Sequence, residues 1–159
     1  MKYIIKELIS IETSKYQIKQ ISAEDTYDVR HPVLRSGKPI ETCIFKGDNL
    51  ETTIHLGIYY NGSIIGVCSF FYNSHKDISE SNQYQLRGMA ILKKYQGKGT
   101  GKTILSYGEN LLKQKNINLI WCNAREVAVN FYKRNGYRTI GKSFNITDIG
   151  LHYVMSKPI

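Results

Sequence analysis

The chain has 159 residues, 42% of them hydrophobic, and a formal net charge of +9. This length suits one domain with a hydrophobic core and is too short for two ordinary domains. No apolar run approaches the ~20 residues of a membrane span, and the first residues carry a charge where a signal peptide is apolar. Three cysteines without CxxC spacing fit reduced thiols, so we expect a cytoplasmic protein. The four histidines are scattered, and we expect no metal site.

The N-terminal third contains weak signals for secondary structure. In residues 2–11 the spacing of the apolar residues fits a helix, while their β-branched side chains favour a strand. In residues 15–21 apolar and polar residues alternate, which predicts the first strand. Ser22, with an acidic residue three positions later, predicts a capped helix start. Pro32 lacks a backbone donor and is expected to kink or end that helix. Residues 36–50 then form a long loop of the kind that often borders a substrate site.

A sheet is predicted from about residue 53 onward. Residues 53–60 and 63–71 flank Asn61-Gly62, which is the strongest two-residue signal for a β-hairpin. A polar loop over residues 73–82 leads to a strand that begins near residue 85. The later elements are predicted as follows: helix after residue 101, strand 117–123, helix 125–134, strand 137–143 and strand 150–157. This order predicts antiparallel strands followed by β-α-β-α-β, and hence a mixed sheet with helices on both faces.

A glycine-rich turn separates the strand near residue 85 from the helix after residue 101. It reads Tyr95-Gln96-Gly97-Lys98-Gly99-Thr100-Gly101-Lys102. Such a turn directs unpaired backbone N–H groups, at the positive end of a helix dipole, toward one point. Glycine permits the positive φ angles of a concave nest and leaves room for a ligand. The turn therefore predicts a phosphate site, with Lys98 and Lys102 adding positive charge.

Two phosphate-binding motifs fail here and a third fits. The run Gly101-Lys102-Thr103 matches the end of a Walker A loop, but that motif needs glycine where this chain has Gln96. The following strand also runs into Asn123 rather than an acidic residue for magnesium. A dinucleotide GxGxxG fails because its last position is Lys102. The pattern [RQ]xxGx[GA] does fit residues 96–101, and it resembles the acyl-CoA pyrophosphate loop of the GNAT superfamily of N-acyltransferases.

A second motif of that superfamily follows in the expected order. Residues 122–137 are similar to its strand that ends in a polar residue, followed by a helix with A…FYxxxGF; here Tyr137 replaces the usual Phe. The likeness covers about residues 50–143, and the first fifty residues carry no motif of the superfamily as a whole. The resemblance implies an α/β (α+β) fold with a mixed, mostly antiparallel sheet of about 6–7 strands flanked by helices on both faces. We predict one such domain over residues 1–159, with residues 1–14 open to being an N-terminal extension.

The resemblance also implies an activity. It predicts an N-acetyltransferase that moves an acetyl group from acetyl-CoA to a primary amine by direct attack in a ternary complex. Tyr132, the Tyr of the FYxxxGF match, is implied to protonate the leaving sulfur. The positions implied to contact the coenzyme are Met89, Ala90, Ile91, Gln96, Gly97, Lys98, Gly99, Thr100, Gly101, Lys102 and Asn123. The acceptor, a small molecule or a peptide, is not specified, because this fold serves many amines.

The general base remains open, because the family has no fixed one. His152 lies on the predicted last strand, beside the acceptor side of this fold, and is a candidate base. Arg30 and His31, at the kink of the first helix, and Glu41 in the following loop are candidate acceptor-side residues. Each has an ordinary structural role as its alternative.

Two other classes of function compete with the enzyme. A CoA-binding sensor or partner module on the same fold would be expected to lack Tyr132 or Asn123, and neither is lost. A basic nucleic-acid-binding domain would interleave aromatic and basic residues on one face, whereas the tyrosines here fall mostly in predicted strands. Nucleic acid is therefore not an expected partner, and a homodimer is left open. The basic residues nearest the glycine turn are Lys93, Lys94, Lys98 and Lys102, and they suit the phosphates of a coenzyme.

Overall fold

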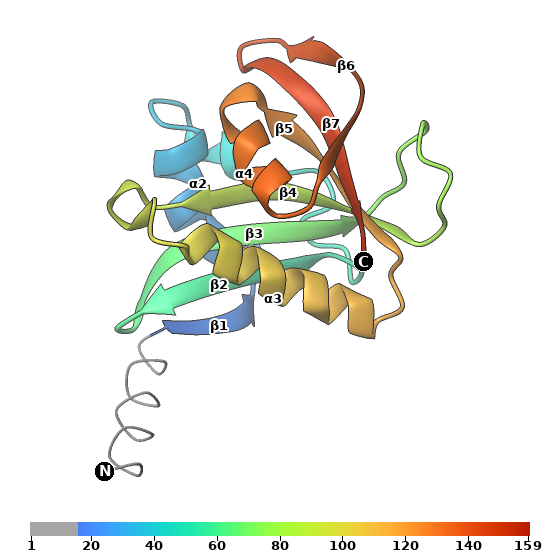
Figure 1. The fold of residues 1–159 in the computed structure, drawn as a ribbon. Coiled ribbons are helices and arrows are strands. Elements are labelled where there is room, and N and C mark those ends of the chain that lie inside the picture. The colour runs from blue at the N-terminus through green and yellow to red at the C-terminus, as the bar shows by residue number, and fades with distance from the viewer. Residues whose placement is uncertain (1–15) are drawn as a thin grey trace, which may run out of the picture.

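The computed structural model describes residues 16–159, so the predictions for residues 2–11 and for an extension over 1–14 lie outside the described part of the chain. Seven strands form a single sheet in the order β1-β2-β3-β4-β5-β7-β6 (Figure 1). They are β1 (Tyr16–Ile21), β2 (Ile54–Tyr60), β3 (Ser63–Tyr72), β4 (Gln83–Ile91), β5 (Leu119–Arg125), β6 (Arg138–Ile146) and β7 (Gly150–Pro158). Neighbours β4 and β5 are parallel and every other pair is antiparallel. The predicted mixed, mostly antiparallel sheet is confirmed.

The described residues form three α-helices and four short 3-10 helices. The α-helices are α2 (Tyr27–Leu34), α3 (Thr100–Gln114) and α4 (Val129–Arg134). The 3-10 helices are η1 (Glu24–Thr26), η2 (Ile40–Cys43), η3 (Lys93–Tyr95) and η4 (Glu126–Ala128). No helix within residues 16–159 is long and apolar enough to cross a membrane.

The two faces of the sheet are covered by different helices (Figure 1). Side chains alternate along a strand, so Val67 of β3 packs with Val29 of α2 on one face. Phe70 of β3 lies in the larger core with Ile104 of α3 on the other face. A Cβ at Gly108 of α3 would overlap the ring of Phe70, so glycine permits this close approach of helix to sheet. Helices on both faces, as predicted, are confirmed.

Local signals in the sequence are mostly confirmed. Asn61 and Gly62 have φ of 47° and 82°, as the tight β2–β3 hairpin requires. Ser22 and Asp25 form a reciprocal cap, with N–H to side-chain oxygen distances of 3.2 and 3.3 Å. Pro32 does not end its helix, because α2 continues to Leu34. Pro32 has no N–H to donate to the Asp28 carbonyl oxygen, so the helix lacks that one hydrogen bond.

The predicted end of the strand over residues 117–123 is wrong by two residues. β5 continues to Arg125 because it keeps pairing with β7, where Arg125 lies opposite His152. The predicted helix 125–134 accordingly begins later, as the 3-10 turn η4 followed by α4. Asn123 therefore lies within β5, one residue past the last residue that pairs with β4.

Candidate active site

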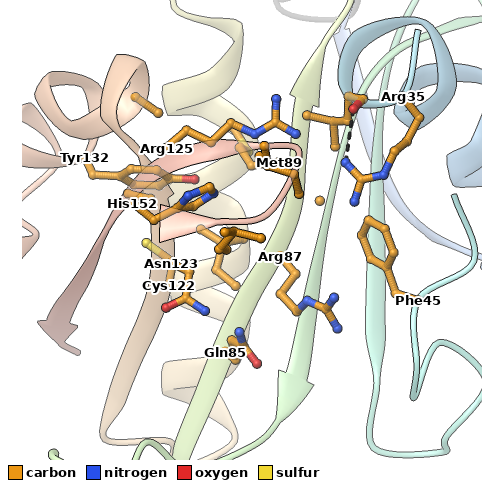
Figure 2. Close-up of a pocket in the computed structure, with 17 residues that line it drawn as sticks. Arg35, Phe45, Gln85, Arg87, Met89, Cys122, Asn123, Arg125, Tyr132 and His152 are labelled. Atoms are coloured by element: carbon orange, nitrogen blue, oxygen red, sulfur yellow. Dashed lines mark hydrogen bonds between the residues drawn. The ribbon is translucent and has the colours of Figure 1, made fainter. Parts of the chain in front are cut away.

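A split between the two parallel strands forms the centre of the site. β4 and β5 are paired from Gln83 to Leu86 and from Leu119 to Cys122, and they separate beyond these residues. Each strand then keeps only its outer partner, β3 for β4 and β7 for β5. A cavity of about 220 Å³ opens in this split and is lined by residues of both strands (Figure 2).

Gly88 shapes the wall that β4 contributes. It has φ of 63°, which favours glycine, and the β3–β4 register shifts beside it, between Val67 and Ser69. A Cβ at Gly88 would lie 3.0 Å from Cε2 of Phe45 and 3.1 Å from Nε of Arg30. The glycine therefore lets the segment after α2 pack directly on β4.

Tyr132 of α4 is placed at this cavity, with its hydroxyl directed inward (Figure 2). Its side chain is 6% exposed, and its ring packs against the rings of Phe131 and Tyr137 with centroids 5.2 and 5.4 Å away. Burial raises its pKa well above the usual value of 10, with the nearby Cys122 and Cys68 thiols adding to the effect. The hydroxyl consequently keeps its proton at neutral pH and can donate it.

His152 of β7 also lines the cavity. Its Nδ1 lies 2.7 Å from the carbonyl oxygen of Gly150. A carbonyl oxygen only accepts hydrogen bonds, so Nδ1 carries the proton of the neutral ring and Nε2 holds the free lone pair. His152 thus has the tautomer that a proton acceptor at Nε2 needs.

Three arginines line the same cavity: Arg35, Arg87 and Arg125 (Figure 2). Arg35 donates to the carbonyl oxygens of Leu34 and Thr42, at 3.0 and 3.3 Å. Within residues 16–159 none of the three forms an ion pair with a carboxylate, and no Asp or Glu lines the cavity.

The charges of these arginines are partly desolvated. Burial lowers the pKa of Arg87, and the nearby charges of Arg30 and Arg35 lower it further while Asp48 opposes them. Burial also lowers the pKa of Arg125, again with a contribution from Arg35. The cavity is therefore strongly electropositive and lacks a protein counterion among the described residues.

The sequence did not identify these arginines, although Arg87 offered a signal. It stands between Leu86 and Gly88 on a strand with no other charged residue, and a partly buried charge needs a partner or a ligand.

The other predicted acceptor-side residues do not line the cavity. Arg30 is fully buried and makes two hydrogen bonds to the Asp48 carboxylate, at 2.8 and 3.1 Å. Its burial leaves no surface for a substrate, so its role is to hold α2 and the following loop on the sheet. His31 contacts the carbonyl oxygen of Lys38 at 2.7 Å, and Glu41 is exposed in η2.

The glycine turn has the geometry of an anion site. Gly97 and Gly99 have φ of 74° and 79°, and a Cβ at either would meet no atom within 4 Å. The α3 hydrogen bonds begin with Thr103 N–H to the Gly99 carbonyl oxygen, at 3.0 Å. The N–H groups of residues 100–102 precede that bond and are left for a ligand. Four exposed lysines, which we call the loop lysines, surround the turn: Lys93, Lys94, Lys98 and Lys102.

The turn and the cavity adjoin each other. A Cβ at Gly101 would lie 3.4 Å from Cε of Met89, which lines the cavity, and 3.3 Å from the ring of Phe131. Gln96 donates from its side-chain amide to the carbonyl oxygen of Ile91, at 2.8 Å, and so ties the turn to the end of β4. The side chain of Ala90 faces α2, so only its backbone is available on this side.

The remaining predictions for the site concern Asn123 and a metal ion. Asn123 is exposed and lines the cavity on β5. Among residues 16–159 no group of three or more His, Cys, Asp or Glu could hold a metal ion.

Comparison with known proteins gives one family. The model of the acetyltransferase (GNAT) family matches residues 15–137, and so reaches well upstream of the motifs visible in the sequence. Among curated proteins, YitI of Bacillus subtilis (strain 168), described as an uncharacterized N-acetyltransferase, is 38% identical over 143 residues. That match covers 90% of this chain and 96% of YitI.

Solved structures share the fold at low sequence identity. The ribosomal-protein-S18-alanine N-acetyltransferase from Escherichia coli superposes with a TM-score of 0.70 at 17% identity, covering 91% of this chain and 94% of its own. An aminoglycoside 6'-N-acetyltransferase complexed with coenzyme A superposes with a TM-score of 0.72 at 10% identity. That match covers 89% of this chain and 96% of the acetyltransferase. At such identities the likeness concerns the fold alone.

Proposed function

The chain belongs to the acetyltransferase (GNAT) family, and on that premise we propose that it transfers an acetyl group from acetyl-CoA to the primary amine of a small, negatively charged acceptor. The observation that carries the proposal is one electropositive cavity, in the split between β4 and β5, that Tyr132 and His152 both line. This cavity adjoins the glycine turn through Met89 and Gly101.

The residues of the turn fit a coenzyme with several phosphates. The open space at Gly97 and Gly99 leaves room for a pyrophosphate, and the free N–H groups at the start of α3 supply donors to it. The loop lysines add long-range attraction. Backbone groups of residues 89–91 and the side chain of Asn123 flank the split and would hold the pantetheine arm.

Acetyl-CoA, when bound, supplies an acetyl thioester, which an amine can attack directly. The amine must first lose a proton, and Nε2 of His152 is proposed to take it, directly or through water. The hydroxyl of Tyr132 is proposed to give its proton to the departing sulfur, because burial keeps that hydroxyl protonated. Backbone N–H groups of β4 beyond Leu86, free of β5, are proposed donors to the carbonyl oxygen.

The charge of the cavity selects the class of acceptor. Arg35, Arg87 and Arg125 repel a polycation such as a polyamine or an aminoglycoside, and they suit a carboxylate or phosphate. A cavity of about 220 Å³ also suits a small molecule better than a lysine side chain presented by a folded protein. We therefore assign the acceptor to small amines that also carry an anionic group, such as amino acids.

A panel of amines tests this function. Each amine is incubated with acetyl-CoA, thiol release is followed, and the acetylated product is identified by mass spectrometry. The panel contains amino acids, acidic amines, polyamines, amino sugars and short peptides. Turnover with anionic amines supports the proposal. Tight CoA binding without turnover of any amine overturns it and favours a CoA-binding module.

A further inference from the structure

Three guanidinium groups lie close to the ring of Phe45. Its centroid lies 4.0 Å from Cζ of Arg30, 4.7 Å from Cζ of Arg87 and 5.5 Å from Cζ of Arg35. Phe45 is 7% exposed and lines the cavity together with Arg35 and Arg87, whereas Arg30 does not. Figure 2 shows the ring beside the side chains of Arg35 and Arg87.

A buried charge pair fixes the backbone of Phe45. Its N–H donates to Oδ2 of Asp48 at 2.8 Å, and the Asp48 N–H donates back to the Phe45 carbonyl oxygen at 3.1 Å. Asp48 is in turn held by the guanidinium of Arg30 and by Nε2 of His55, which lies 2.8 Å from the Asp48 carbonyl oxygen. The backbone of Phe45 is thus held by the buried Asp48, while the residue lines the cavity.

The Phe45 ring lies beside two positive charges that have no carboxylate partner within residues 16–159. Arg35 and Arg87 are near enough to repel each other, and neither forms an ion pair with a carboxylate of the described residues. A carboxylate clamp would hold them but would also cancel the charge that an anionic acceptor needs. The face of an aromatic ring attracts a guanidinium and leaves its charge available.

We propose that Phe45 is a positioning residue for the acceptor site, whose ring holds the guanidinium of Arg87, and that of Arg35 more weakly, toward the cavity. This inference rests on the anionic acceptor proposed above. Phe71, whose ring centroid lies 5.3 Å from Cζ of Arg87, supports the same guanidinium from β3. Plain core packing is the alternative role, and it predicts that Phe45 matters for stability but not for anion binding.

The test uses inorganic phosphate as the probe and the full chain labelled with ¹⁵N, with the arginine Nε–H resonances as the readout. Phe45→Leu keeps an apolar side chain but removes the ring, so the Kd for phosphate should rise about three- to tenfold. Phe45→Tyr keeps the ring and should stay within about twofold of the wild type. Tyr59→Leu is the matched control, because it removes a similar contact, of Lys19 over the Tyr59 ring at 4.3 Å, outside the cavity, and should change nothing.

The outcomes separate this inference from the proposed function. If Arg87→Gln weakens phosphate binding while Phe45→Leu leaves it at the wild-type value, the positioning role is overturned and the anionic acceptor stands. Unchanged binding in Arg87→Gln overturns both. If Phe45→Leu does not fold, the wild type decides: an Arg87 Nε–H that is ordered and ring-current shifted before phosphate is added supports the inference, and a mobile, unshifted one overturns it.

Discussion

Replacing Tyr132 by Phe removes one hydroxyl and keeps the ring contacts to Phe131 and Tyr137. No hydrogen bond of this hydroxyl is present among the described residues, so the free energy of unfolding should change by about 1 kcal/mol or less. A proton donor acts mainly in the transition state, so kcat should fall roughly ten- to a thousandfold, equivalent to about 1.4–4 kcal/mol. Coenzyme affinity should stay nearly constant.

The assay combines steady-state thiol release with calorimetry of CoA binding. The loss in kcat should shrink with an acyl donor whose thiol is more acidic, because that leaving group needs less help. Tyr137→Phe is a matched control: its hydroxyl donates to Oε2 of Glu109 at 3.1 Å and does not line the cavity, so stability should fall while kcat is kept. Full kcat in a folded Tyr132→Phe variant would refute the reasoning and leave Tyr132 as a core aromatic.

Three further predictions concern the coenzyme and the pH dependence of stability. Gly99→Val should weaken the free energy of CoA binding, measured by calorimetry, by about 3 kcal/mol or more, because a branched side chain occupies the turn. The control Gly37→Val lies outside the turn at a similar φ of 74° and should bind CoA normally. If the loop lysines serve the phosphates, CoA affinity should weaken as salt rises, and dephospho-CoA should show lower affinity with a shallower salt dependence; equal behaviour of the two ligands would contradict this. Burial raises the pKa of Tyr132 and Tyr137 in the folded state, so the unfolded chain loses these protons first and the free energy of unfolding should fall as pH rises above about 10. Urea denaturation should show a smaller fall with pH in Tyr132→Phe than in the wild type, and an equal fall in both would contradict this prediction.

Much of the fold could be predicted from local signals in the sequence. The Asn61-Gly62 hairpin, the Ser22–Asp25 cap and the glycine turn each depend on residues that are neighbours along the chain. Gly97 and Gly99 have the positive φ angles that the turn was expected to need. The order of the elements predicted a mixed sheet, but it did not predict that β7 lies between β5 and β6.

The acceptor cavity could not be predicted in the same way. It exists because β4 and β5 separate after Leu86 and Cys122, a tertiary event that no local pattern encodes. The arginines around it come from three distant segments. Among the acceptor-side residues expected near the first helix, Arg30 turned out to be buried, and Arg35, one residue past the end of α2, lines the cavity instead. Two arginines five residues apart look alike in a sequence. The buried one, Arg30, is distinguished by tertiary partners, which are the Asp48 carboxylate, the Cys43 carbonyl oxygen and the Ser69 hydroxyl.

The central claim is acetyl transfer to an anionic amine in the arginine-lined cavity, and one comparison of kcat/KM tests it most directly. Amino acids and their uncharged carboxamides are compared as acceptors of the acetyl group from acetyl-CoA, in the wild type and in Arg87→Gln. A charge-assisted hydrogen bond is worth about 1.5–3 kcal/mol, so the wild type should prefer the carboxylate by roughly ten- to a hundredfold, and Arg87→Gln should lose most of that preference. A wild type that acetylates the carboxamide as well as the carboxylate, or that prefers a polyamine, would contradict the account.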